Sequence, residues 1–499
     1  MVHNAGRRWL VLIVVSAGLL LITLDNSILY SALPTLVEDL GATGSESLWI
    51  INAYPVVMAG LLLGSGTLGD RVGHRRMFVI GLTVFGLASL AAAFASSPEA
   101  LIASRAFLAV GAAAMMPATL ALIRVMFEDQ RERNVAIAVW GSLAVVGSAL
   151  GPIVGGVLLN SFWWGSVFLV NVPVVAVALV ATLLLAPPHQ ADPSARWDLP
   201  SSLLALVALV GLVMAIKETS KPEPEPGFIA AAVVAALAGG WVFARRQRRL
   251  AHPLLEFSLF RDRAFLAGVL AAGFSLFAVA GIQLVTTQRF QLVEGLTPLG
   301  AGLLVAAIAV GALPTALAGG ALLHRVGLLP LIAGGLALGA AGTALVLANF
   351  DTSTGLLVTG LLVTGAGLGA AMSVASSAIM GNAPASRAGM ASSVEEVSYE
   401  FGSLIAVALL GSLMAALYTS TVDLPAGTPE SARDSLDTAL ALAGDDNQAL
   451  VSAASYAFDS AYSTVLTVVA AVVAAGALVT GLLLRHHGPG SALSSDARH

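Results

Sequence analysis

The sequence predicts an all-α protein that crosses a membrane many times. Of its 499 residues, 57% are hydrophobic and only 11% are charged, a balance far from that of soluble domains. Apolar runs long enough to cross the hydrocarbon core, about 30 Å thick, recur along the whole chain. The Lys and Arg residues gather in alternate connections between these runs, which is the bias that orients membrane helices.

Fourteen apolar runs are long enough to span a bilayer. They lie at about residues 9–33, 48–68, 77–95, 99–123, 134–159, 165–186, 199–216, 227–244, 264–287, 298–322, 327–349, 354–380, 388–415 and 461–484. With the N-terminus inside, most basic residues fall in the inner connections, and an even number of helices keeps both termini cytoplasmic. Arg7 and Arg8 precede the first run as in a signal peptide, but that run is too long for one and contains Asp25, which predicts a retained helix.

Composition excludes several classes of protein. Cysteine is absent, which rules out disulfides, thiol catalysis and cysteine metal sites. Neither Lys217 nor Lys221 precedes Ser or Thr, so the chain has no Walker A loop for ATP, and it has no His-Glu-x-x-His zinc motif. We therefore expect no enzyme activity, no bound cofactor or metal, and no nucleic-acid partner.

The thirteenth run carries three acids: Glu395, Glu396 and Glu400. A charge at bilayer depth costs at least about 2.5–3.5 kcal/mol, so the presence of these acids predicts a functional role. Glu396 and Glu400 are one helical turn apart, and one of two such close carboxylates is expected to hold a proton near neutral pH. Glu395 is rotated by about 100° and is expected to face another neighbour. A pair that exchanges a proton for a cation would couple transport to protons; the alternative is pairing with polar groups on adjacent helices.

An internal repeat divides the chain. Residues 66–73 follow the second run, residues 320–327 follow the tenth, and the two segments agree at five of eight positions. Parallel repeats with a substrate site between them are a transporter architecture. We therefore predict six-helix halves at 1–190 and 251–499, with an inserted helix pair at 191–250.

Two connections stand out from the rest. The outer segment 420–460 is long and polar, and it is expected to form either a small cap with a short helix, using Leu436, Leu440 and Leu442, or a flexible loop. The basic loop 245–249 is interpreted as a topology anchor near anionic lipid.

A glycine stripe marks the fifth run. Gly147, Gly151 and Gly155 recur at four-residue spacing beside Pro152, and such small residues allow close helix approach. The stripe is either an ordinary packing seam or a hinge and seal between the halves.

Several motifs together resemble one family. Residues 66–76 look like the loop between helices two and three of the major facilitator superfamily, and Arg105 with Gly111 resembles its basic helix-four motif. The glycine stripe at 147–156 resembles the motif of its exporters, and residues 24–34 resemble the first-helix motif of its fourteen-span drug:proton antiporters. Residues 48–54 and 395–400 are similar to the QacA, SmvA and LfrA group of quaternary-ammonium and dye exporters.

This resemblance implies a major facilitator fold with helices arranged 6+2+6. It also implies a proton-coupled multidrug antiporter that exports lipophilic cations, works as a monomer in the bacterial inner membrane and needs only the proton gradient. The closest alternative is the same antiport with tetracycline-like drugs, self-produced antibiotics or a lipid as cargo. A membrane-embedded enzyme and a passive channel are rivals of other classes.

The resemblance and the residue chemistry together nominate site residues. The proton and cation sites are predicted at Asp25, Glu395, Glu396, Glu400 and Arg105. Asp25 and Arg105 are expected at one depth, where the guanidinium would keep the carboxylate ionised.

The remaining candidates form three groups. The substrate pocket is predicted at Asn52, Trp49, Tyr54 and Tyr399, the conformational latch at Gly66, Asp70, Arg71, Gly73 and Arg75, and the exporter seam at Gly147, Gly151, Pro152 and Gly155. Tyr30, Met58, Met115, Met116, Phe274, Phe277 and Met372 are further candidates for apolar walls. The related group commonly carries Asp at the position of Asn52, so the sequence predicts a preference for monovalent over divalent cations.

Overall fold

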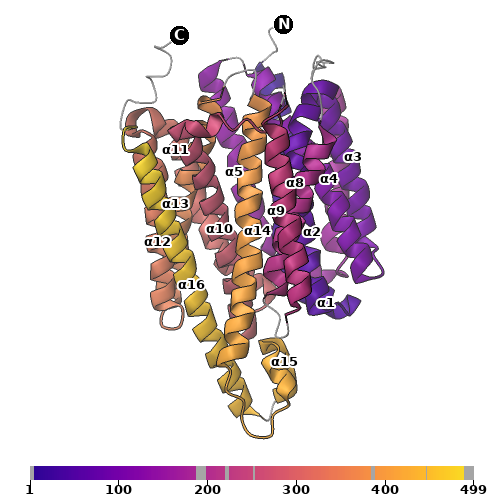
Figure 1. The fold of residues 1–499 in the computed structure, drawn as a ribbon, viewed down its shortest axis with the longest axis vertical. Coiled ribbons are helices and arrows are strands. Elements are labelled where there is room, and N and C mark those ends of the chain that lie inside the picture. The colour runs from indigo at the N-terminus through magenta and orange to yellow at the C-terminus, as the bar shows by residue number, and fades with distance from the viewer. Residues whose placement is uncertain are drawn as a thin grey trace.

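A computed structural model describes residues 5–127, 129–186, 198–219, 224–250, 253–383, 388–444 and 447–487. These residues form a bundle of long helices, and no strand occurs among them (Figure 1). The helices of the first part are α1 (Ala5–Leu40), α2 (Gly44–Val72), α3 (His74–Ala93), α4 (Pro98–Met126), α5 (Gln130–Ser161), α6 (Ser166–Leu169) and α7 (Asn171–Leu185). They continue with α8 (Leu199–Glu218), α9 (Pro226–Gln247), η1 (Leu259–Arg261), α10 (Arg263–Leu292), α11 (Pro298–Val326), α12 (Leu328–Asn349) and α13 (Thr354–Gly381). The last are α14 (Ala388–Thr421), η3 (Glu430–Arg433), α15 (Leu436–Ala443) and α16 (Gln448–Leu484).

The helices account for all fourteen predicted spans. Twelve helices in the described part of the chain are long and apolar enough to cross a membrane. The other two spans are α2 and α5, whose apolar segments Trp49–Leu62 and Leu150–Ser161 are shorter although each helix has about 30 residues. The sixth span is divided into α6 and α7. The start of α1 and the end of α16 lie at the same end of the bundle, as an even number of spans requires (Figure 1).

Capping residues explain where many helices begin. Thr43 and Glu46 form a capping box at the start of α2, in which each side chain satisfies a free backbone N–H of the other. Ser97 and Thr297 cap α4 and α11, and a proline follows each of them at the first helical position.

The buried apolar residues form two large cores. The first lies almost entirely between Val11 and Ala178, and the second between Ala264 and Leu484. A small cluster of Val56, Val213 and Leu404 joins α2, α8 and α14, so the pair α8–α9 contacts helices of both cores. The space between the two cores is where a shared site can form.

The repeated loop has the same backbone geometry in both copies. Gly73 and Gly327 each end one helix and begin the next, with φ of 99° and 88°, a region that side chains disfavour. Each donates its N–H to the carbonyl four residues earlier, at 2.8 Å for Gly73 and 2.9 Å for Gly327. The matching glycine is therefore required by the turn.

The long connection between α14 and α16 is an ordered cap at the end opposite the termini (Figure 1). Tyr418 and Thr419 donate their hydroxyls to the carbonyls of Ala432 and Arg433, each at 3.1 Å, and α15 packs on α16. The expected short helix is present, but its predicted face is partly wrong. Leu436 is buried and Leu442 is 44% exposed, because the helix turns its alanines Ala439 and Ala443 inward.

Candidate functional site

A cavity of about 240 Å³ lies between the two cores. Its described walls come from α1, α2, α4 and α5 on one side and from α10, α11, α13 and α14 on the other. These are the first, second, fourth and fifth helices of each predicted half. The arrangement is what a parallel repeat with a site at its interface requires.

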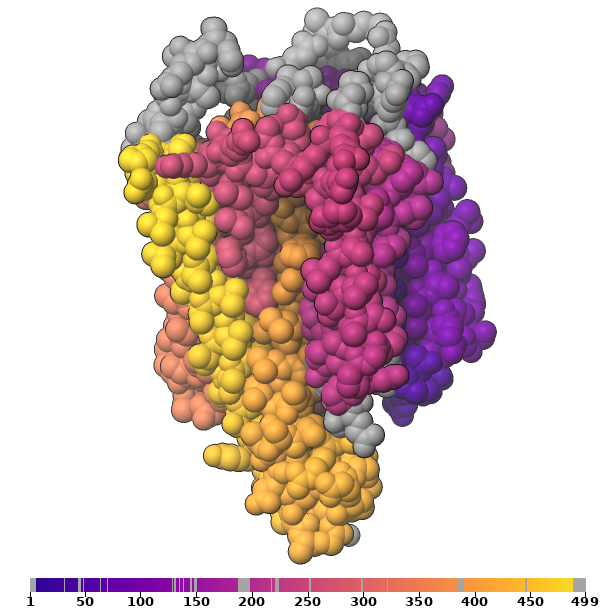
Figure 2. Space-filling model, viewed as in Figure 1, coloured from indigo at the N-terminus to yellow at the C-terminus, as the bar shows by residue number. Residues whose placement is uncertain are grey.

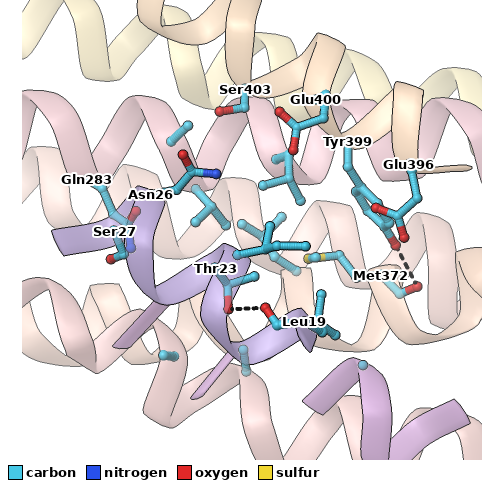
Figure 3. Close-up of a pocket in the computed structure, with 18 of the residues that line it drawn as sticks. Leu19, Thr23, Asn26, Ser27, Gln283, Met372, Glu396, Tyr399, Glu400 and Ser403 are labelled. Atoms are coloured by element: carbon cyan, nitrogen blue, oxygen red, sulfur yellow. Dashed lines mark hydrogen bonds between the residues drawn. The ribbon is translucent and has the colours of Figure 1, made fainter. Parts of the chain in front are cut away.

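The three acids of α14 all line this cavity. Figure 3 shows Glu396 and Glu400 projecting from α14 beside Tyr399, across from Asn26 and Thr23 of α1. Glu395 and Glu396 are only 1% and 3% exposed. Glu396 lies within electrostatic range of both other carboxylates, whereas Glu395 lies beside Ser376 of α13 and Tyr399. The expected difference in neighbours is present, but both acids border the same space.

The predicted pairing of Asp25 with Arg105 is present in the structure. The two side chains form an ion pair in which each is 1% exposed. Asn171 of α7 donates to the second oxygen of Asp25 at 2.8 Å. Arg105 also donates to the carbonyl of Ile50 at 3.3 Å and to the side-chain oxygen of Asn26 at 3.1 Å. This network connects α1, α2, α4 and α7, and two of its members, Asn26 and Arg105, line the cavity.

The cavity carries an excess of carboxylates. Arg105 is the only Lys or Arg among the described residues that line it, and Asp25 already balances its charge. The three glutamates of α14 have no comparable partner in the wall. A low-dielectric site with uncompensated acids favours either protons or a cationic ligand.

Only one of the four predicted pocket residues lines the cavity. Tyr399 does, and its hydroxyl donates to the carbonyl of Met372 at 3.4 Å (Figure 3). The structure places Trp49, Asn52 and Tyr54 away from the wall. Tyr54 is buried with its ring 4.7 Å from the guanidinium of Arg105.

The reason for this difference is the rotation of α2, which presents Ile51 and Pro55 to the cavity. Among the wider candidates Tyr30, Met116 and Met372 line the cavity, whereas Met58, Met115, Phe274 and Phe277 do not.

Several lining residues were missed by the sequence analysis. They include one aromatic and a set of neutral polar side chains: Trp140, Thr23, Asn26, Ser27, Gln283, Ser376 and Ser403. Asn26 and Ser27 adjoin Asp25 in the first-helix motif, so a signal was present there. No charge or pattern distinguishes Trp140 or Gln283 from packing residues.

Asn52 leads to a testable prediction about stability. It is fully buried, and neither polar atom of its side chain has a hydrogen-bond partner among the described residues. An unsatisfied buried amide costs about 1–3 kcal/mol. We expect Asn52→Leu to raise the thermal unfolding midpoint of the purified protein and Asn52→Asp to lower it, without a change in the ratio of monovalent to divalent cation efflux. A lower midpoint for Asn52→Leu, or a changed efflux ratio for Asn52→Asp, would contradict this.

The glycine stripe of α5 has two different neighbours. A side chain added at Gly147, Gly151 or Gly155 would meet Thr23, Ser27 or Ile28 of α1, so these glycines allow α1 and α5 to pack closely inside one half. Pro152 and Gly156 instead contact Gly302 and Leu299 of α11, in the other half. The part of the motif that lies between the halves is therefore Pro152 with Gly156, near the end that carries the α15 cap.

This placement gives a second prediction. A Cβ at Gly156 would lie 3.0 Å from Cβ and 3.1 Å from Cα of Leu299, so Gly156→Leu should push α5 and α11 apart at this end. Spin labels at Asn160→Cys and Leu296→Cys in this cysteine-free chain should report a larger population of long distances. Gly240→Leu on α9, where an added Cβ meets nothing within 4 Å, is the matched control. Identical distance distributions in the two variants would show that this contact does not hold the helices together.

The predicted latch residues surround the turn between α2 and α3. Gly66 is buried in α2, Gly73 forms the turn, Arg71 is exposed, and Arg75 donates to the carbonyl of Leu183 in α7 at 2.5 Å. The side chain of Asp70 lies outside the described residues. A latch between conformational states remains a prediction.

Comparison with known proteins decides the family. A profile of the Major Facilitator Superfamily matches residues 15–407, which includes both walls of the cavity. The chain belongs to the major facilitator superfamily. The solved structure of a bacterial homologue of the human lysosomal transporter Spinster has the same fold, with a TM-score of 0.64 at 16% identity, covering 97% of this chain and 99% of that one.

Two relatives within the superfamily are similar over nearly their whole length. The multidrug efflux pump LfrA of Mycolicibacterium smegmatis is 38% identical over 488 residues, covering 96% of this chain and 97% of LfrA. The methyl viologen resistance protein SmvA of Salmonella typhimurium is 35% identical over 470 residues, covering 92% and 95%. One relative is thus named as a multidrug efflux pump and the other as a resistance protein, in the group that the motifs resembled. The chain itself is a multi-pass membrane protein of the major facilitator superfamily.

Proposed function

We propose that this protein is a proton-coupled multidrug antiporter that exports lipophilic cations, such as quaternary ammonium compounds and dyes, from the bacterial cytoplasm. The end that carries both termini faces the cytoplasm in this proposal, because the basic connections gather there. The protein acts as a monomer in the inner membrane and takes its energy from the proton gradient, with no bound cofactor.

The observation that carries the proposal is the charge balance of the cavity. Glu395, Glu396 and Glu400 border a space whose described walls contain one guanidinium, which Asp25 already neutralises. Protons and a lipophilic cation can compete for these carboxylates, and that competition is the basis of antiport. The remaining wall suits an apolar cation, because the ring faces of Tyr30, Trp140 and Tyr399 attract positive charge.

The contacts between helices support a cycle of alternating access. The contacts of Pro152 and Gly156 with α11 bring the two helices close together, and in this proposal they close the cavity toward the end with the α15 cap. A cation that enters from the terminus-bearing end would displace protons from α14. Separation of α5 from α11 would then open the opposite end, where protons rebind and release the cation.

Ethidium efflux from proteoliposomes tests the proposal. We expect uphill ethidium movement when a pH gradient is imposed, no accumulation when the gradient is collapsed, and proton movement in the opposite direction. Ethidium movement that ignores the pH gradient would contradict proton coupling.

A substrate panel tests the cargo separately. Benzalkonium and ethidium should compete with each other for export, whereas a neutral or anionic drug of similar size should not compete, because it cannot replace a proton on the acids of α14. Methyl viologen belongs in the panel because a relative is named for resistance to it. Efflux confined to tetracycline-like compounds or a lipid would show that the cargo is wrong while leaving the antiport mechanism intact.

A further inference from the structure

The inserted pair α8–α9 has an exposed basic surface that the transport cycle does not use. The pair lies at the periphery of the bundle, coloured magenta at the front of Figure 2. Only 11% of the residues in the apolar segment of α9 are buried. Four arginines lie at or just beyond the end of this helix: Arg245, Arg246, Arg248 and Arg249.

One of the four arginines is already occupied. Arg246 makes two hydrogen bonds of 2.9 Å to the carboxylate of Asp198, which joins the end of α9 to the start of α8. The hydrogen bonds from Arg246 lower the pKa of Asp198, so this carboxylate stays ionised and the pair is electrically balanced.

Gln247 connects the end of α9 to α8 and to the loop that follows. Gln247 is 2% exposed, donates to the hydroxyl of Ser201 at 2.6 Å and accepts from the backbone N–H of Leu254 at 2.7 Å.

The other three arginines are exposed and have no carboxylate partner among the described ion pairs. The guanidinium of Arg245 lies 5.1 Å from the ring of Trp241, and that of Arg248 lies 5.7 Å from the ring of Phe257. Glu256, the first acid in the loop that follows, accepts a hydrogen bond from Ser258 at 2.6 Å. The aromatic rings hold two of the guanidinium groups in place and leave their N–H donors free for an anion.

The exposed residues of α9 follow one line along the helix. Positions 234, 237, 241, 245 and 248 are spaced by three or four residues and therefore share one face. Val234 and Leu237 are 63% and 70% exposed, and Trp241 is 61% exposed. From Leu237 to Arg245 the helix rises about 12 Å. Apolar residues, an indole and then guanidinium groups match in order the acyl chain, the interface and the phosphate of a phospholipid.

From this arrangement we infer that Arg245, Arg248 and Arg249, with Trp241, form a binding site for the headgroup of an anionic phospholipid. Under the orientation proposed above, the site faces the cytoplasmic leaflet. Because α8 contacts both α2 and α14, a lipid held there sits on the helix pair that touches both halves. Recognition by the guanidinium groups requires a phosphate diester with uncompensated charge, so phosphatidylglycerol fits and phosphatidylcholine, which is zwitterionic, does not.

Native mass spectrometry of the purified full chain in neutral detergent tests the site. The protein is mixed with equal amounts of phosphatidylglycerol and phosphatidylcholine, and the retained lipid is counted. We expect wild type to retain phosphatidylglycerol preferentially, and the triple variant Arg245→Gln/Arg248→Gln/Arg249→Gln to retain it on the order of tenfold to a hundredfold more weakly. The matched control Arg261→Gln/Arg325→Gln/Arg485→Gln removes the same charge from other exposed positions and should behave as wild type.

Three outcomes would overturn the inference. Equal retention of the two lipids by wild type would do so without any variant, as would equal losses in the triple variant and its matched control. Complete displacement of phosphatidylglycerol by millimolar inorganic phosphate would identify a free-anion site instead. None of these measurements depends on transport, so the lipid site and the antiport mechanism can fail separately.

Discussion

Glu396→Gln is expected to abolish pH-driven export while the protein still folds and inserts. Glutamine keeps the size of the side chain and its position at 3% exposure on the cavity wall, but it cannot release a proton. Glu395 and Glu400 remain, so ethidium should still bind. In wild type the binding should weaken as the pH falls, because protons compete for the carboxylates, and in Glu396→Gln this pH dependence should be reduced. Proteoliposome efflux and ethidium fluorescence titrations at several pH values measure the two effects.

Glu38→Gln is the matched control, because it makes the same chemical change at an exposed position of α1. It should leave both efflux and the pH dependence of binding unchanged. Normal uphill efflux in Glu396→Gln, and also in Glu396→Gln/Glu400→Gln, would show that the proton travels by another route and that the assignment of coupling to α14 is wrong.

The second large effect is expected when the ion pair between Asp25 and Arg105 at the cavity wall is broken. Asp25→Asn leaves the guanidinium of Arg105 charged at 1% exposure, and loss of one partner of a buried ion pair costs about 3–5 kcal/mol. The same change removes the anionic acceptor of the Asn171 hydrogen bond. We therefore expect a large fall in the thermal unfolding midpoint together with loss of efflux. Arg105→Gln should be similarly harmful, because it leaves Asp25 without its cation.

A double-mutant cycle separates the contribution of this ion pair to stability from its contribution to transport. Asp25→Asn/Arg105→Gln removes both charges and should be more stable than either single variant, although it should still fail to transport if the pair takes part in coupling. Additive losses of stability in the double variant would mean that the two residues act independently. Recovery of transport in the double variant would show that the pair serves only to hold α1, α2, α4 and α7 together.

These two predictions assign different tasks to the two halves. The acids of α14 border the cavity directly, and Figure 3 shows two of them, Glu396 and Glu400, opposite polar side chains of α1. In the Asp25–Arg105 pair, Arg105 lines the cavity and Asp25 does not, and Arg105 is within electrostatic range of Glu400. Movement of one half against the other would change this distance. The balance between protonated and ionised acids would then depend on conformation, as antiport requires.

Much of this architecture was predictable because membrane helices follow local rules. Hydrophobic length located fourteen helices, twelve of which are long and apolar enough to cross a membrane. The repeat at residues 66–73 and 320–327 marked the same turn twice, where Gly73 and Gly327 have positive φ. A charge in a membrane span needs a partner or a function, and this rule predicted Asp25, Arg105 and the acids of α14 as site residues. Distance along each helix from its end was enough to place Asp25 and Arg105 at one depth.

The sequence by itself thus determined the fold class, the family and the acids of the cavity. The reason is that the length of an apolar run, a charge within it and a repeated motif can each be recognised in a short segment of the chain. Only the tertiary structure decided which face of each helix borders the cavity. It turned Asn52 and Tyr54 of α2 away, brought Trp140 of α5 and Gln283 of α10 to the wall, and divided the α5 glycines between α1 and α11. The physical reason is that lipid provides no hydrophobic contrast with an apolar helix. The rotation of each helix is therefore set by close packing with its neighbours, which no single segment of the sequence specifies.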